Sequence, residues 1–131
     1  MIRKETFEIQ GKQVEIQQFS AVQGWKILRK ITSCVGPAIG KGTMDPGMAV
    51  DVLFQRLPEA ELIGLLKKLT QFVWIDGRPV NFEMDMVVGE FSLKVLTEVL
   101  RLNFEEFFLT IKELFTGLAE EVQNLTMSSE S

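Results

Sequence analysis

The feature that most constrains the fold is a run of apolar residues that recurs at alternating spacings of four and three. Its members share one face of a helix over three heptads: Phe104, Phe108, Ile111, Phe115, Leu118, Val122 and Leu125. An earlier apolar stripe consists of Phe91, Val95, Leu96, Val99 and Leu100. The sequence therefore predicts helix from Asp85 onward, with a break or kink at Asn103 between the two stripes.

The N-terminal region alternates polar and apolar residues, as a half-buried β-strand does. Residues 5–19 predict a β-hairpin with a tight turn at Gly11-Lys12. One face of this hairpin is expected to carry Phe7, Ile9, Val14 and Ile16.

Ser20 and Gln23 form a capping box for a helix that is expected to reach Val35 and to end at Gly36-Pro37. Its predicted buried stripe is Ile27, Leu28, Ile31, Cys34 and Val35, with Trp25 at the edge. We expect Trp25, Leu28 and Ile31 to pack against the hairpin.

The middle of the chain predicts a glycine- and proline-rich loop over 38–47 and short helices over 48–56 and 58–70. A strand at 72–75, a turn at Asp76-Gly77 and a return at 80–82 predict a second short hairpin near 73–82. The expected fold class is mainly α (α+β), with the N-terminal β-hairpin packed on a helical bundle. We expect one domain over 1–126 and a flexible polar tail over 127–131.

Residues that carry chemistry are few. The 131 residues include no histidine or tyrosine and one cysteine, Cys34, which removes histidine-dependent triads and histidine metal sites. The pairs Glu105-Glu106 and Glu120-Glu121 point about 100° apart on a helix, so they are not natural acid–base pairs. Glu83 and Asp85 are expected near a helix N-terminus rather than at a metal. We therefore expect no catalysis, no metal and no cofactor.

Charge is divided unevenly along the chain. Residues 1–82 contain 11 basic and 8 acidic residues, whereas residues 83–131 contain 3 and 10. This division indicates either an interaction surface or the solvated outer faces of separate helices. The acidic half argues against nucleic acid, although Lys26, Arg29 and Lys30 could contact phosphate. Because no apolar run approaches the roughly 18 residues of a membrane span and no signal peptide is evident, we expect a soluble protein without membrane contact.

The heptad stripe has two interpretations. It lies on the protein's own core, or it forms a seam for a helix of a partner or of a second copy. Phe107, Leu109 and Leu114 widen the apolar surface beyond the stripe, which favours a covered surface and self-association. The candidate protein-binding residues are Phe104, Phe107, Phe108, Ile111, Leu114, Phe115 and Leu118.

Several stretches follow one another in a recognisable order. FEIQGKQVEIQQF leads into AVQGWKILRKITSCVGPAIG, then LLKKLTQFVWIDGRPV, then LTEVLRLNFEEFF. Two motifs carry the likeness: GPAIG at residues 36–40, and NF..F with Asn103, Phe104 and Phe107. In this order of features the chain resembles the tail assembly chaperones of long-tailed bacteriophages over nearly its whole length.

The resemblance implies a partner, the tape measure protein, a long aggregation-prone helical ruler. The chaperone would keep it soluble in the host cytoplasm while the tail tube polymerises around it, with the tail tube protein as a further candidate partner. It would be absent from the mature virion, and many such chaperones also have a longer, frameshifted form. The alternatives are a small phage or bacterial structural or adaptor protein that remains in the particle, a DNA-binding regulator and, more remotely, an enzyme.

Overall fold

Two antiparallel strands form the predicted N-terminal hairpin in the computed structural model, which describes residues 2–39 and 46–130. They are β1 (Lys4–Ile9) and β2 (Lys12–Gln17). The predicted turn position was wrong by one residue, since the turn lies at Gln10 and Gly11, with φ angles of 51° and 78°. A two-residue turn of this class requires positive φ at both positions, which glycine adopts without strain.

The alternation of the hairpin correctly predicts its buried face. Val14 and Ile16 are fully buried, Ile9 is buried and Phe7 is half-buried. Residues two apart on a strand point to the same side, so one set faces the core and the other faces water.

The predicted second hairpin is present and extends the first into one sheet. Strands β3 (Val73–Ile75) and β4 (Arg78–Pro79) flank a turn at Asp76-Gly77, with φ angles of 50° and 82°. The prediction that the chain returns at 80–82 was wrong, because the two-residue turn starts the return strand at Arg78, and Phe82 already begins a helix. Strand β2 pairs antiparallel with β3, which gives the order β1-β2-β3-β4. Pro79 lies on the edge strand, where its missing N–H costs no ladder bond.

Helix α1 (Ala21–Ile39) begins where the capping residues predict and ends later than expected. The Ser20 hydroxyl accepts a long bond of 3.5 Å from the Gln23 N–H. The prediction that Gly36-Pro37 ends the helix was wrong, because the helix continues to Ile39. Proline disfavours a helical residue before it partly through a clash with that residue's Cβ, which Gly36 lacks.

Four of the five predicted residues of the buried face of α1 are in the core: Ile27, Leu28, Ile31 and Cys34. The side chain of Val35, the fifth, lies outside the described residues. The prediction that Trp25 packs against the hairpin was wrong, since 69% of its surface is exposed. Helix α1 packs against α2 and α5 rather than against the hairpin. The outward side of its first turns therefore carries an aromatic ring that the core does not use.

The two short helices in the middle of the chain are confirmed as α2 (Pro46–Arg56) and α3 (Glu59–Leu69). Pro58 separates them, and Leu65 and Leu69 are the buried residues of α3. The ends of the expected 38–47 loop belong to α1 and α2, and residues 40–45 lie outside the described part of the chain.

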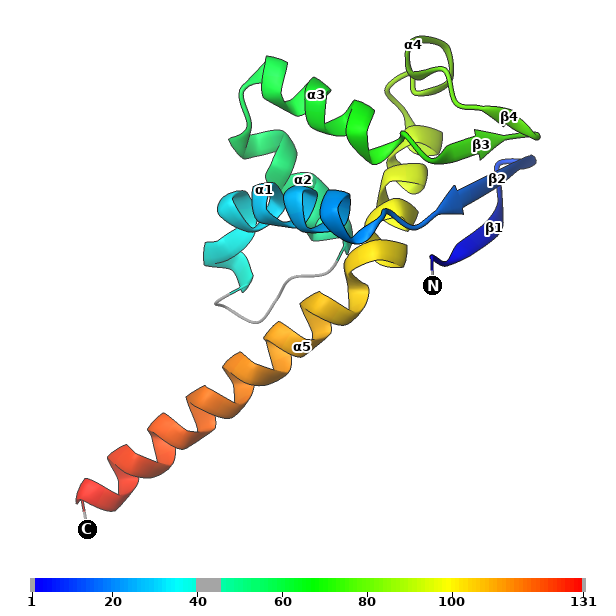
Figure 1. Cartoon of the computed structure of the whole chain (residues 1–131). Helices are drawn as coiled ribbons and strands as arrows, with labels where there is room; N and C mark the ends of the chain where they lie inside the picture. The colour runs from blue at the N-terminus through cyan, green and yellow to red at the C-terminus, as the bar shows by residue number, and fades with distance from the viewer. Residues whose placement is uncertain (1, 40–45, 131) are drawn as a thin grey trace.

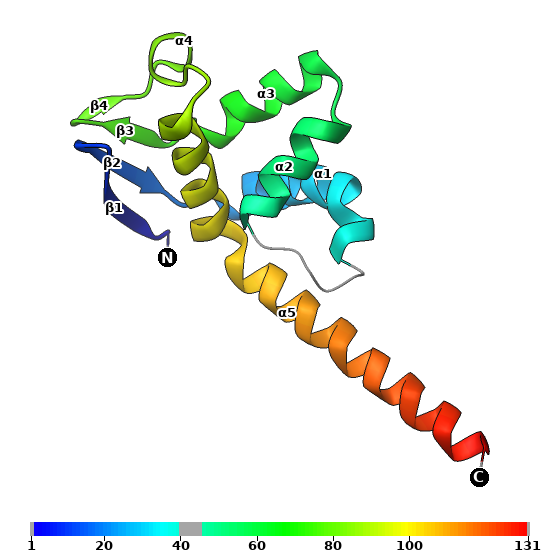
Figure 2. The ribbon, with the colours of Figure 1, turned by 180° about the vertical axis from the view of Figure 1, so that it is seen from behind.

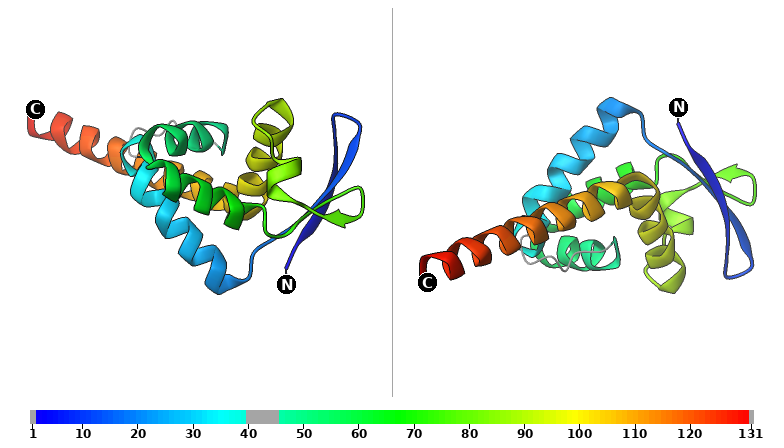
Figure 3. Two further views of the ribbon diagram at one scale, coloured as in Figure 1. Left: turned by 90° about the horizontal axis from the view of Figure 1, so that it is seen from above. Right: turned by 90° about the horizontal axis from the view of Figure 1, so that it is seen from below.

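The last two helices are α4 (Phe82–Asp85) and the long α5 (Glu90–Glu130). The first turns of α5 lie between the sheet on one side and α1, α2 and α3 on the other (Figures 1 and 2). The C-terminal end of α5 projects beyond these elements (Figure 3). The helix has no break at Asn103, although its axis changes direction where its yellow part turns orange (Figure 1).

The core gathers around the first half of α5. Val95, Leu96, Val99 and Leu100 are buried there together with residues of the sheet and of α1, α2 and α3. The fold is therefore mainly helical with a small sheet, as the sequence predicts. The division into a domain over 1–126 and a flexible tail stays a prediction.

Candidate protein-binding surface

One hydrogen bond ties the entry of α1 to α5, and a second bond within α5 holds its acceptor, Asn103, in place. The Phe19 N–H donates to Asn103 Oδ1 at 2.9 Å, and Asn103 Nδ2 donates to the Val99 carbonyl at 2.9 Å. The Phe19 ring lies between two others, 6.1 Å from Phe72 and 6.4 Å from Phe104. These contacts fix the crossing of α1 and α5 at the place where α5 leaves the core.

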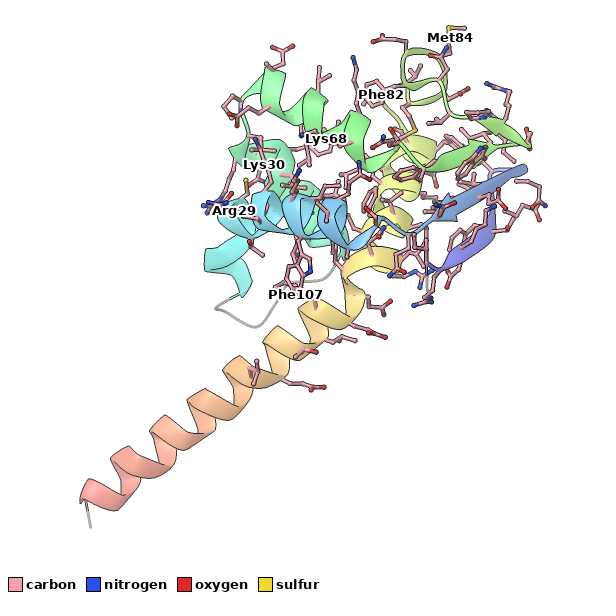
Figure 4. The ribbon with its side chains drawn as sticks, viewed as in Figure 1. Arg29, Lys30, Lys68, Phe82, Met84 and Phe107 are labelled. Atoms are coloured by element: carbon pink, nitrogen blue, oxygen red, sulfur yellow. The ribbon has the colours of Figure 1, made fainter. Side chains whose placement is uncertain are left out.

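A hollow of about 240 Å³ lies at this crossing. Its lining includes Gly24, Trp25 and Leu28 on α1 and Asn103, Phe104 and Phe107 on α5. Phe107 is half-buried and lies on the side of α5 that faces α1 (Figure 4). The hollow is therefore an apolar notch whose rim carries two aromatic side chains.

Exposed apolar side chains extend this notch along both helices. Val22 and Trp25 are 66% and 69% exposed on α1, and Leu114 is 59% exposed on α5. Leu114 follows Phe107 by seven residues, so it lies on the same side of α5 two turns further on. We refer to Val22, Trp25, Phe107 and Leu114 as the α1–α5 apolar surface.

The structure distributes the sequence-predicted binding residues between the core and this surface. Phe104 is only 4% exposed and belongs to the core. Phe107 and Leu114 lie on the α1–α5 apolar surface. The side chains of Phe108, Ile111, Phe115 and Leu118 lie outside the described residues.

Sequence reasoning missed the contribution of α1. Val22 and Trp25 are spaced by three, and Arg29 follows Val22 by seven, so the three share one helix face away from the buried stripe. That spacing could have predicted an exposed apolar face on this helix. Trp25 was instead predicted to pack against the hairpin, because a tryptophan beside a buried stripe is usually buried.

Arg101 holds the first half of α5 against β1, on the sheet side of the same crossing. Its guanidinium bonds to Glu98 at 2.7 Å and Glu5 at 2.9 Å, and lies 5.4 Å from the Phe7 ring. The hydrogen bond from Arg101 lowers the pKa of Glu5, and Glu98 followed by Glu5 raises the pKa of Arg101. These contacts orient α5, and with it Phe107.

A second hollow, of about 670 Å³, lies between α1 and α3 and is basic. Its rim carries Lys26 and Lys30 of α1 and Lys67 and Lys68 of α3, and we call it the basic groove. Figure 4 shows Lys30 and Lys68 on the two helices that form its walls. Two of the three residues considered for phosphate contact, Lys26 and Lys30, line this groove, and Arg29 is exposed nearby.

Asp85, one of the two acids expected near a helix N-terminus, makes structural hydrogen bonds. Asp85 accepts from the Asn81 N–H at 2.7 Å and from both terminal nitrogens of Arg78 at 3.2 and 3.0 Å. The backbone bond from Asn81 is the largest cause of the lowered pKa of Asp85, followed by Arg78. Over residues 2–39 and 46–130, no cluster of three or more metal-ligating side chains is present. Among the described helices, none is long and apolar enough to cross a bilayer.

Exposed aromatic and aliphatic side chains around a notch between two helices are typical of a domain that binds other proteins. Residues 10–119 match the sequence model of a family described as phage tail assembly chaperone protein, TAC. That match covers most of the chain, so the chain belongs to the phage tail assembly chaperone family. Comparison with curated proteins and with solved structures gives no match.

Proposed function

We propose that this chaperone binds a hydrophobic helix of the tape measure protein and keeps that protein soluble while the tail assembles. Membership of the tail assembly chaperone family supports the general role. The observation that carries the proposal is the α1–α5 apolar surface, which exposes a tryptophan and a leucine beside the notch at Phe107. The proposed role is binding without catalysis.

The geometry suits an amphipathic helix laid across the notch. Such helices place apolar anchors at spacings of three, four and seven residues into a hydrophobic groove. Trp25 is the expected main anchor, since a tryptophan brings a large apolar area with few rotatable bonds. Glu106 and Glu113 are exposed on α5 and would keep the complex hydrated.

The test is co-expression with the tape measure protein. Trp25→Asp and Leu114→Asp each place a charge on the α1–α5 apolar surface, and we expect the soluble fraction of the partner to fall at least fivefold. Val88→Asp is the matched control, because Val88 is 92% exposed in the segment just before α5 and lies outside this surface. Circular dichroism and thermal melting first establish that each variant is folded.

The result that contradicts the proposed surface is a folded Trp25→Asp/Leu114→Asp variant that solubilises the partner as well as the parent chain does. If the parent chain itself neither binds nor solubilises the tape measure protein, the proposed partner is wrong. The tail tube protein is then tested in the same assay.

We further propose that the protein acts in the host cytoplasm and leaves before the particle is complete. The alternative is a small structural or adaptor protein that remains in the particle. Mass spectrometry of purified particles separates them, because a chaperone is absent from mature virions and an adaptor is present in stoichiometric amounts.

A further inference from the structure

We propose that the basic groove receives the acidic C-terminal half of α5 from a second copy of this chain. The proposal concerns a different surface from the α1–α5 apolar surface and does not depend on the tape measure protein. It rests on the charge of the groove, the composition of the helix and the direction in which that helix extends.

The groove presents more positive charge than its own acids balance. Lys26, Lys30, Lys67 and Lys68 surround it, and Glu61 is the acidic residue of its lining, 3.7 Å from the Lys30 ammonium group. The floor contains the apolar side chains of Ile27 and Leu65. A helix bound in the groove would therefore contact apolar side chains on the floor and lysine side chains on both walls.

Gly64 widens the groove in the middle of α3. A Cβ built on this residue meets nothing within 4 Å, so the position opens onto free space. A glycine inside a helix costs roughly 1 kcal/mol relative to alanine. Its absent side chain lets another backbone approach α3 closely.

The C-terminal half of α5 has the opposite charge. Residues 105–130 contain six glutamates and one lysine. Glu106 and Glu113 are exposed, and the sequence repeats a glutamate seven residues later, at Glu120. Positions seven apart share one face of a helix, so the spacing gives α5 an acidic row.

The acidic row lies opposite the apolar heptad stripe in the sequence. When Phe104 and Phe108 occupy the core-type positions d and a of the heptad, Glu106, Glu113 and Glu120 occupy position f, on the far side of the helix. Docking through the acidic row therefore leaves the apolar stripe uncovered.

The groove of the same chain is out of reach of this segment. Helix α5 is continuous to Glu130, and its C-terminal end projects beyond α1 and α3 (Figures 1 to 3). A helix of about 26 residues is roughly 39 Å long and cannot fold back on itself. A second copy supplies the same acidic segment without that constraint.

The experiment measures self-association of the full chain by sedimentation velocity at several concentrations. Lys26→Glu/Lys68→Glu reverses one lysine on each wall of the groove, and Glu113→Lys/Glu120→Lys reverses the acidic row. Each variant alone is expected to weaken association at least tenfold. An equal mixture of the two is expected to associate again, because each reversed surface then meets its complement. Raising the salt concentration from 50 to 500 mM weakens the parent association, since exposed charges are screened.

The matched control is Lys4→Glu/Lys94→Glu, which changes the net charge equally through exposed lysines outside the groove. It is expected to associate as the parent does. A parent chain that stays monomeric up to about millimolar concentration overturns the proposal, and so does association that neither reversal alters. Binding of duplex DNA is measured for the parent chain and for Lys26→Glu/Lys68→Glu. If the variant loses DNA binding while its self-association is unchanged, the groove binds a nucleic acid and the proposal is equally overturned.

Discussion

Asn103 is the residue that fixes α5 against the entry of α1. Replacing it with alanine removes the acceptor for the Phe19 N–H and leaves that part-buried donor unpaired. An unpaired buried donor costs about 1–3 kcal/mol, so Asn103→Ala should lower the free energy of unfolding by that amount in a guanidinium titration. Asn103→Asp keeps an acceptor and should fall between the parent and alanine.

The control for this prediction is Gln18→Ala, which removes a bond to the Arg3 N–H at an exposed position. Water replaces that partner, so the expected loss is below about 0.5 kcal/mol. Equal losses for Asn103→Ala and Gln18→Ala would show that the α1–α5 crossing does not depend on Asn103.

Helix α1 has one buried and one exposed apolar face, and substitutions should distinguish their contributions to stability. Leu28→Ala removes buried side-chain volume and should cost about 2–5 kcal/mol of unfolding free energy. Trp25→Ala should cost less than about 1 kcal/mol, because the ring is mostly exposed. Both values come from denaturant unfolding, and a loss for Trp25→Ala as large as that for Leu28→Ala would place Trp25 in the core.

The elements with clear local signals were predictable from sequence. Alternation gave the buried face of the β1–β2 hairpin, and Pro58 separated α2 from α3. The prediction that α1 ends at Gly36-Pro37 was wrong, because the steric clash that disfavours a helical residue before proline depends partly on a Cβ, which glycine lacks.

Contacts between segments that are far apart in the sequence could not be predicted from local sequence patterns. The pairing of Val14 with Ile75 joins two hairpins into one sheet, and the pattern of neither strand specifies its partner. Asn103 was predicted as a possible kink, but its bond to Phe19 spans 84 residues. Trp25 was predicted to be buried from its hydrophobicity alone, which does not distinguish a buried tryptophan from an exposed one.

At the scale of the whole molecule, α5 should make unfolding cooperative. It contacts α1, α2, α3, β1 and β2, so no group of these elements keeps a complete core without it. We expect a single two-state transition. In a Trp25→Phe variant, the fluorescence of Trp74 in β3 reports the sheet and circular dichroism at 222 nm reports the helices. Their guanidinium midpoints should coincide, and separated midpoints would show that the sheet and the helices unfold independently.

The topology also governs when the chaperone becomes competent during its own synthesis. Strand β2 pairs with β3, which is synthesised more than fifty residues later. Because an isolated hairpin is marginally stable, the N-terminal strands leave the ribosome long before their partner strand is available. The α1–α5 apolar surface takes Trp25 from an early segment and Phe107 from a late one. A half-made chain therefore lacks the proposed binding surface, which is complete only after the late residues of α5 have been synthesised and folded against α1.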